Sequence, residues 1–141
     1  MGIFSSMQIS ASGLTAERLR LETIANNLAN INTTRTAAGG PYRRQTPVFA
    51  EKLEKAIGSP AKFRGAGVQV VEIVHDPGEP RLVYDPAHPD ARGDGYVAYP
   101  NINVVNEMVD MITATRAYEA NITAINAAKT MALKALEIGR G

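Results

Sequence analysis

The chain has 141 residues, a length typical of one domain, and its 15 basic and 14 acidic residues leave a formal net charge of +1. This even balance gives no electrostatic footprint for nucleic acid, and the absence of cysteine excludes disulfides, thiol catalysis and cysteine-ligated metals. No apolar run approaches the roughly 20 residues needed to cross a bilayer, and the first residues lack the basic and apolar segments of a cleavable signal peptide.

Residues 7–31 carry apolar side chains on one helical stripe, which we name the N-terminal stripe. It consists of Met7, Leu14, Leu21 and Leu28 at seven-residue spacing, with Ile24 and Ile31 three residues after the last two. This spacing predicts a helix with a narrow apolar face that needs a partner helix to cover it. Serine is a favourable cap, so we expect the helix to begin near Ser5 or Ser6 and to end within residues 30–33. Gly13 weakens the helix by about 1 kcal/mol relative to alanine, which predicts a bend or a frayed first part.

Four asparagines cluster at the end of this predicted helix, namely Asn26, Asn27, Asn30 and Asn32. Asparagine is a mediocre helix former, so a cluster of this density needs a physical reason. A buried asparagine fixes the register between packed helices at some cost in stability, whereas solvated asparagines simply mark a helix end. The sequence leaves both interpretations open.

Residues 36–100 are rich in proline and glycine and contain four short runs with β-strand character. The runs are residues 42–49, 68–74, 81–84 and 95–99. Pro47 indicates a sheet edge for the first run, and Val71 breaks the alternation of the second, which predicts a bulge or burial of both faces. Large apolar residues are scarce in this insert, so we expect a small sheet that needs the terminal helices for support.

A second helix is predicted after Pro100, with Asn101 or Asn103 as its N-cap and Gly139 as its C-cap. Its apolar side chains recur every three or four residues, as on one face of a helix. We name this row the C-terminal stripe: Met108, Met111, Thr115, Tyr118, Ile122, Ile125, Lys129, Ala132 and Leu136. A further apolar set lies beside it: Val105, Val109, Ile112 and Leu133.

These patterns predict a mainly α fold with a small β-rich insert. An N-terminal core helix (residues 1–35) and a C-terminal core helix (101–141) pair as a coiled-coil-like hairpin around the insert (36–100), as one structural unit. Two helices cannot cover apolar stripes on several sides, so the pattern favours assembly with neighbouring subunits over a closed monomer. The expected subunit interface comprises Leu14, Leu21, Ile24, Asn27, Leu28, Asn30, Ile31, Met108, Met111, Ile112, Thr115, Arg116, Tyr118, Asn121, Ile122, Ile125 and Leu136.

A catalytic role has little support in the sequence. A metal hydrolase needs a cluster of His and Asp ligands, and the sequence offers His75 and Asp76 with only one further histidine, His88. Their spacing matches no recognisable zinc or calcium site, and neither a phosphate loop nor a serine elbow accompanies them. Solvated loop residues are the favoured interpretation, so we expect no enzyme activity, no cofactor and no metal, with the hydrolase as a disfavoured alternative.

Several segments resemble those of a known family. Ala25-Asn26-Asn27-Leu28-Ala29-Asn30-Ile31-Asn32-Thr33 is similar to the N-terminal signature of bacterial flagellar rod and hook proteins. The C-terminal signature of this family resembles Arg116-Ala117-Tyr118-Glu119-Ala120-Asn121, Lys129-Thr130-Met131 and Leu136-Glu137-Ile138-Gly139. The proximal rod members are the most similar in the insert, at Pro41-Tyr42-Arg43-Arg44, Gly67-Val68-Gln69-Val70, Leu82-Val83-Tyr84-Asp85-Pro86 and Gly95-Tyr96-Val97.

The resemblance implies a structural subunit of the proximal rod of the flagellar basal body, within the drive shaft that transmits torque from motor to hook. It also implies export by the flagellar type III apparatus without a cleaved signal, a place in the periplasmic space, and assembly with copies of itself and with FlgB, FlgF, FlgG and FliE. Neither nucleic acid nor a small-molecule substrate is expected. A non-flagellar helical-pair adaptor or a secretion-needle-like subunit stays open, because apolar stripes predict helix partners without identifying them.

Overall fold

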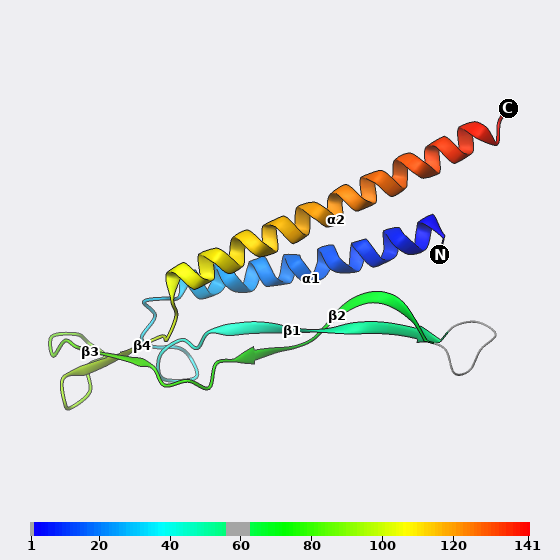
Figure 1. The fold of residues 1–141 in the computed structure, drawn as a ribbon. Helices are drawn as coiled ribbons and strands as arrows, with labels where there is room; N and C mark the ends of the chain where they lie inside the picture. Colours follow the sequence, from blue (N-terminus) through cyan, green and yellow to red (C-terminus); the bar gives the residue numbers. More distant parts are fainter. Residues whose placement is uncertain (1, 56–62) are drawn as a thin grey trace.

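The computed structural model describes residues 2–55 and 63–141. Its elements follow in the order α1 (Ile3–Ala29), β1 (Gln45–Lys55), β2 (Phe63–His75), β3 (Arg81–Tyr84), β4 (Tyr96–Tyr99) and α2 (Val104–Ile138). The helices run antiparallel side by side, and the β1–β2 hairpin lies along the side of α1 away from α2 (Figure 1). The expected mainly α fold with paired terminal helices and a small β insert is confirmed. Within the described residues α1 is covered on two sides, whereas α2 packs against α1 and against no strand.

α1 begins earlier than predicted. Its N-cap is Gly2, which makes no side-chain bond to the helix, while Ser6 lies inside the first turn and donates its hydroxyl to the carbonyl oxygen of Ile3 at 2.8 Å. The helix ends at Ala29, one residue before the predicted range. It is continuous through Gly13, so the expected fraying of the first part is not seen. Packing on two sides supplies the stability that local propensity lacks there.

The β1–β2 hairpin is longer than the predicted strands. β1 begins at Gln45 rather than at residue 42 and continues to Lys55, while β2 begins at Phe63 rather than at residue 68. Most of the added residues are charged or small, such as Glu51, Lys52 and Gly65, and they give no regular apolar alternation. These residues form strands because those of β1 pair with those of β2 across the hairpin, and local sequence does not encode this pairing.

Two sequence expectations for this hairpin hold. Pro47 lies in β1, which pairs only with β2, so Pro47 occupies an edge strand as expected. The register shifts where Val48 pairs with Glu72 and Phe49 with Val70, which leaves Val71 as the bulged residue. The bulge interpretation of the broken alternation was therefore right.

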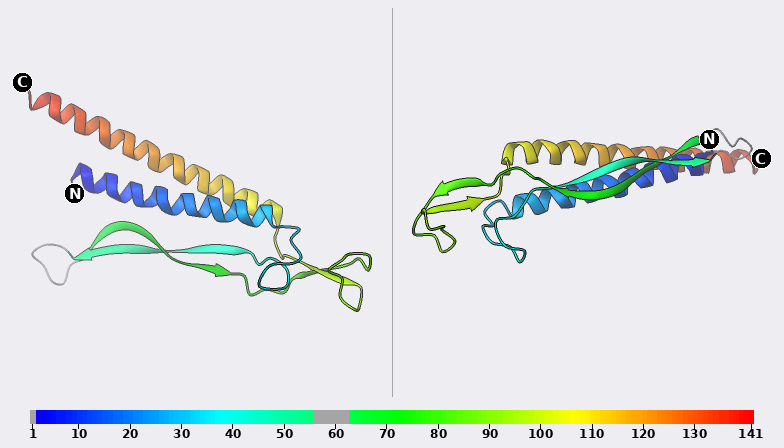
Figure 2. Two further views of the ribbon diagram at one scale, coloured as in Figure 1. Left: turned by 180° about the vertical axis from the view of Figure 1, so that it is seen from behind. Right: turned by 90° about the horizontal axis from the view of Figure 1, so that it is seen from below.

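The second sheet is a short hairpin of β3 and β4 at the end of the molecule opposite to both termini (Figure 2). β3 matches its prediction, and β4 begins one residue later than predicted, at Tyr96. Val97 and Ala98 of β4 are buried, whereas every residue of β3 is exposed. Thr34, in the connection between α1 and β1, donates to Asp90 Oδ2 at 2.7 Å and ties that connection to the β3–β4 loop.

α2 has the caps that the sequence predicted. The Asn103 side chain accepts hydrogen bonds from the backbone N–H groups of Val105 (3.0 Å) and Asn106 (3.2 Å), and Gly139 is the C-cap. With 35 residues against 27 in α1, its C-terminal end extends past the start of α1 (Figure 1). Neither α1 nor α2 has an apolar stretch long enough to cross a membrane.

Candidate functional site

The most covered row of α2 in its contact with α1 consists of small and polar side chains. On α2, four covered residues recur at seven-residue spacing and form what we name the inner row: Glu107, Ala114, Asn121 and Ala128. On α1, Gly13 permits the close approach, because a Cβ at this position would lie 2.9 Å from the Asn121 amide. Glycine at position 13 therefore leaves room for the Asn121 side chain between the two helices.

The C-terminal stripe does not face α1 as one unit. Met111, Tyr118 and Ile125 are half-buried beside the inner row. Exposed members of the predicted interface on α2 are Met108, Ile112, Thr115, Arg116, Ile122 and Leu136, as is Lys129 of the stripe. The predicted stripe merged two adjacent helical rows because apolar residues occur on both. Of the polar residues in the inner row, Asn121 was in the predicted interface, whereas Glu107 was not, because an apolar pattern does not reveal a buried glutamate.

The predicted interface residues of α1 are more covered than those of α2. Ile24 and Asn27 are buried, and the half-buried members are Leu14, Leu21, Leu28, Asn30 and Ile31. Their cover comes from the position of α1 between α2 and the hairpin. The largest uncovered apolar surface of the helix pair therefore lies on α2.

A buried polar cluster joins both helices to the start of β1, and we name it the polar clamp: Asn27, Tyr42, Arg44 and Glu107. Glu107 is only 1% exposed. Its Oε1 accepts from Arg44 Nε, and its Oε2 accepts from Asn27 Nδ2 at 3.2 Å. A buried carboxylate is tolerated when it is paired and hydrogen-bonded in this way. The clamp thus connects three segments that are distant in sequence.

Asn27 is the centre of the clamp. Its Nδ2 also donates to the Gln45 carbonyl oxygen, and its Oδ1 accepts from the Tyr42 hydroxyl and from Gln45 N, each at 2.9 Å. Asn27 is fully buried, so the register interpretation applies to it, whereas Asn26 and Asn32 are exposed at the helix end. Burial and the neighbouring Glu107 carboxylate raise the pKa of Tyr42 above its ordinary value of 10.0.

Further ion pairs flank the clamp. Asp110 Oδ2 lies 3.4 Å from Arg44 Nη2, and its Oδ1 lies 3.8 Å from Arg20 Nη2 on α1. These pairs are partly exposed and contribute little individually, on the order of 0–1 kcal/mol each. Together with the polar clamp, these ion pairs fix the positions of α1, α2 and the insert relative to one another.

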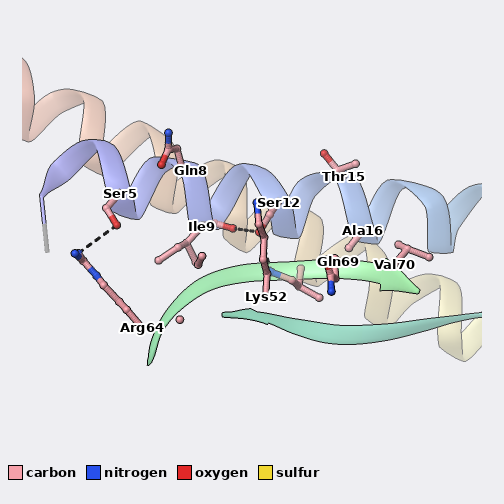
Figure 3. Close-up of a pocket in the computed structure, with 13 residues that line it drawn as sticks. Ser5, Gln8, Ile9, Ser12, Thr15, Ala16, Lys52, Arg64, Gln69 and Val70 are labelled. Carbon is pink, nitrogen blue, oxygen red and sulfur yellow. Dashed lines mark hydrogen bonds between the residues drawn. The ribbon is translucent and has the colours of Figure 1, made fainter. Parts of the chain in front are cut away.

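On its other side, α1 is fastened to β2 across a cleft of about 640 Å³ (Figure 3). The Ser12 hydroxyl accepts from Val68 N at 3.0 Å and donates to the Ile9 carbonyl oxygen at 2.6 Å. Gly67 has a φ of 108°, and a Cβ there would overlap Ser12 Oγ, so glycine is required for this approach. Arg64 Nη2 donates to Ser5 Oγ at 3.4 Å.

The residues considered for catalysis do not converge. His75 is exposed at the end of β2, and His88 lies in the β3–β4 loop, where its Nδ1 accepts from Asp90 N at 3.0 Å. Asp76 closes a turn by accepting from Gly78 N at 2.7 Å. Within residues 2–55 and 63–141, no three His, Asp or Glu side chains gather as metal ligands would. His75 is thus a strand residue, and His88 and Asp76 are loop and turn residues.

Sequence reasoning missed the partners of the polar clamp. Neither the predicted interface nor the candidate catalytic residues included Glu107, and Arg44 appeared only in a predicted strand and in a segment that resembles the family, although the two side chains form an ion pair. The one available signal was the seven-residue spacing that relates Glu107 to Ala114, Asn121 and Ala128. The sequence alone does not show that the polar residues of this row are buried, because the position of the partner Arg44 is known only from the structure.

Comparisons with known proteins cover the chain from end to end. The family model described as "Flagella basal body rod protein" matches residues 7–35, and that described as "Flagellar basal body rod FlgEFG protein C-terminal" matches residues 94–138. The flagellar basal-body rod protein FlgC of Borreliella burgdorferi is 49% identical, over 100% of both chains. FlgC of Bacillus subtilis is 44% identical and FlgC of Salmonella typhimurium 37% identical, each over 99% of this chain and 100% of the relative.

Proposed function

We propose, on the premise that the chain belongs to the FlgC family of flagellar basal-body rod proteins, that it builds the proximal part of the rod by packing its helix pair against those of neighbouring subunits. As a member of that family the chain is a structural subunit of the bacterial flagellar basal-body rod and not an enzyme. Its contribution to carrying torque from motor to hook is part of the proposal.

The observation that carries the proposal is the uncovered apolar surface of α2. Val105 is 67% exposed, Ile112 57% and Leu136 66%, and no described strand packs on this helix. Apolar surface of this extent along one helix is typical of an interaction site. A coiled-coil-like helix pair whose inner contact is already filled has its outer side available for the helices of neighbouring subunits.

The polar clamp supports the torque-carrying part of the proposal. A subunit that transmits torque must keep its segments in fixed positions. Glu107 holds Arg44 of the insert and Asn27 of α1 at one buried point, and the Ser12–Val68 hydrogen bond fastens the hairpin further along α1. We infer that the segments 1–35, 36–100 and 101–141 act as one unit in the rod.

We infer from the family resemblance that FlgB, FlgF, FlgG and FliE are its neighbours in the rod. The same resemblance supports assembly in the periplasmic space after export by the flagellar type III apparatus without a cleaved signal. A helix pair whose outer surface is apolar suits a subunit that leaves the cell before it meets its partners.

Deletion of the gene followed by complementation tests the proposed function. Deletion should abolish swimming and leave basal bodies without a complete rod in electron micrographs. Complementation with Leu28→Asp should fail because it places a charge at a half-buried position, and Ile122→Asp should fail because it places a charge in the proposed contact with a neighbouring subunit. Replacing residues 90–92 by Gly-Ser-Gly should be milder. Intact rods in the deletion strain, together with loss of another secreted assembly, would instead support the needle-like or adaptor alternative.

A further inference from the structure

The outer side of α2 has a mixed stripe of apolar and polar residues. We name this row the outer stripe: Val105, Met108, Ile112, Glu119, Ile122 and Asn126, which recur three, four or seven residues apart and are all exposed. Arg116 and Glu119 are both exposed, and neither makes an ion pair with any part of the chain that the structure describes. Two unpaired opposite charges thus interrupt an otherwise apolar surface.

A groove between α1 and β2 has partly apolar, charged and polar sections in an order that matches the outer stripe. Two hollows of about 530 and 410 Å³ share Leu19 and Glu22 as lining residues and form the continuous α1–β2 groove. Near the C-terminal end of α1 the lining combines Ala25, Ala29 and Ile73 with the polar residues Thr23, Asn26 and Gln45. Arg18 and Glu22 follow, 2.9 Å apart, and then Thr15 and Val70. Beyond them the groove joins the polar cleft of Figure 3.

We propose that the α1–β2 groove of one copy of this chain receives the outer stripe of a second copy, with the incoming α2 antiparallel to α1. This inference rests on the proposed function and names the contact through which copies associate. In this register Arg18 faces Glu119 and Glu22 faces Arg116, so all four charges meet an opposite charge. The second copy thus supplies opposite charges for Arg116 and Glu119, which are unpaired within the described part of the chain.

The same register also matches the apolar and polar parts. Ile112 of the incoming helix reaches the section at Ala25 and Ala29. Ile122 reaches the section at Thr15 and Val70, and Asn126 reaches the polar cleft beyond. The opposite, parallel orientation brings Arg18 to Arg116 and Glu22 towards Glu119, where like charges repel. Charge and apolar surface therefore select one orientation and one register.

The register implies an axial step between copies. Within one chain Asn27 meets Glu107 and Gly13 meets Asn121, which places Glu22 at the level of Ile112. In the proposed contact Glu22 is instead level with Arg116 and Arg18 with Glu119, a shift of about three to four residues along α2. This shift corresponds to about 5–6 Å. Because two different surfaces meet and each copy is displaced, the contact generates an open helical array and not a closed dimer.

Charge reversal tests the contact in cells that carry only the variant gene. Arg18→Glu and Glu119→Arg each bring like charges together and should lower the yield of intact rods about tenfold or more. The double variant restores opposite charges between copies and should recover most of that yield. Arg92→Glu and Glu79→Arg, at exposed loop positions outside both surfaces, are the matched controls and should have no effect. Undiminished single variants, or a double variant as impaired as either single, would overturn the proposal.

Disulfide trapping provides a second test, because the chain has no cysteine of its own. Two differently tagged copies, one with Ala29→Cys and one with Met108→Cys, should form a mixed disulfide dimer on oxidation of assembled basal bodies. Ala29→Cys combined with Ala87→Cys should not. Rods that form without the expected dimer would refute the contact alone. Rods that form without the gene would refute the proposed function itself, so the two failures are distinguishable.

Discussion

Removal of the Glu107 carboxylate should destabilise the whole subunit. Glu107→Ala deletes the acceptor of Arg44 and of one Asn27 hydrogen bond, at a position that is 1% exposed. Breaking a buried ion pair by removing one partner costs about 3–5 kcal/mol, mostly because the other charge is left without compensation. The effect therefore depends on how much compensation Arg44 retains.

Arg44 keeps two polar neighbours after this change. Its side chain is 28% exposed, its Nη2 lies 3.4 Å from Asp110 Oδ2, and its Nη1 donates to Thr46 Oγ1 at 2.8 Å. Partial solvation and these neighbours place the expected loss below the full buried-pair value, at about 2–3 kcal/mol of unfolding free energy. For a chain of this size the midpoint of thermal unfolding should fall by about 10 °C.

Urea and thermal unfolding of the purified chain, followed by circular dichroism, measure this loss. Asp110→Asn is the matched control, because it removes a carboxylate one turn further along α2 that is 38% exposed. The control should cost less than about 1 kcal/mol. Equal, small effects of both substitutions would show that the polar clamp does not hold the segments together.

Three further predictions concern other contacts of the helices. The unfolding free energy should fall as pH rises above about 10, because a raised folded-state pKa of Tyr42 contributes stability that is complete below the unfolded pKa and lost above the folded one. Tyr42→Phe should lack this decline, and parallel pH profiles of both proteins would contradict the assignment. Gly13→Leu should cost about 1–3 kcal/mol in urea unfolding by forcing Asn121 away, and an unchanged midpoint would argue against the close approach. Gly67→Ala should speed hydrogen exchange of the hairpin through overlap with Ser12 and strain at φ 108°, and unchanged exchange would refute this.

The sequence predicted the existence of both helices better than the faces they bury. Strong periodicity placed α1 and α2 to within a few residues, because helix formation depends on local pattern and caps. The face of α2 that packs on α1 was predicted in part: Met111, Tyr118 and Ile125 are half-buried as the stripe suggested. The pattern did not reveal that Glu107 is buried or that Met108 and Ile112 are exposed. Periodicity assumes that the apolar face is the covered one, and this assumption fails for Met108 and Ile112, which are exposed.

The polar clamp shows a different limit of sequence reasoning. Asn27 stood out as part of an asparagine cluster, but its partner Glu107 lies 80 positions away and Arg44 lies 63 positions from Glu107. Nothing local indicates which of several charged residues will be buried together. The β strands were underestimated for a related reason, because the pairing of β1 with β2 depends on contacts between segments and not on the propensity of either one.

The placement of apolar residues explains why the chain is better regarded as part of an assembly than as a self-sufficient domain. Ala16, Ala114 and Ala128 lie in the interior, while Met108 and Ile112, which would gain more from burial, face outward. Burial of a large aliphatic side chain stabilises by about 1.5–3 kcal/mol, considerably more than alanine contributes. The chain leaves large apolar side chains of α2 exposed, and in the proposed assembly these side chains are buried by neighbouring subunits. Burial that is gained only on assembly favours the assembled state over the separate chain.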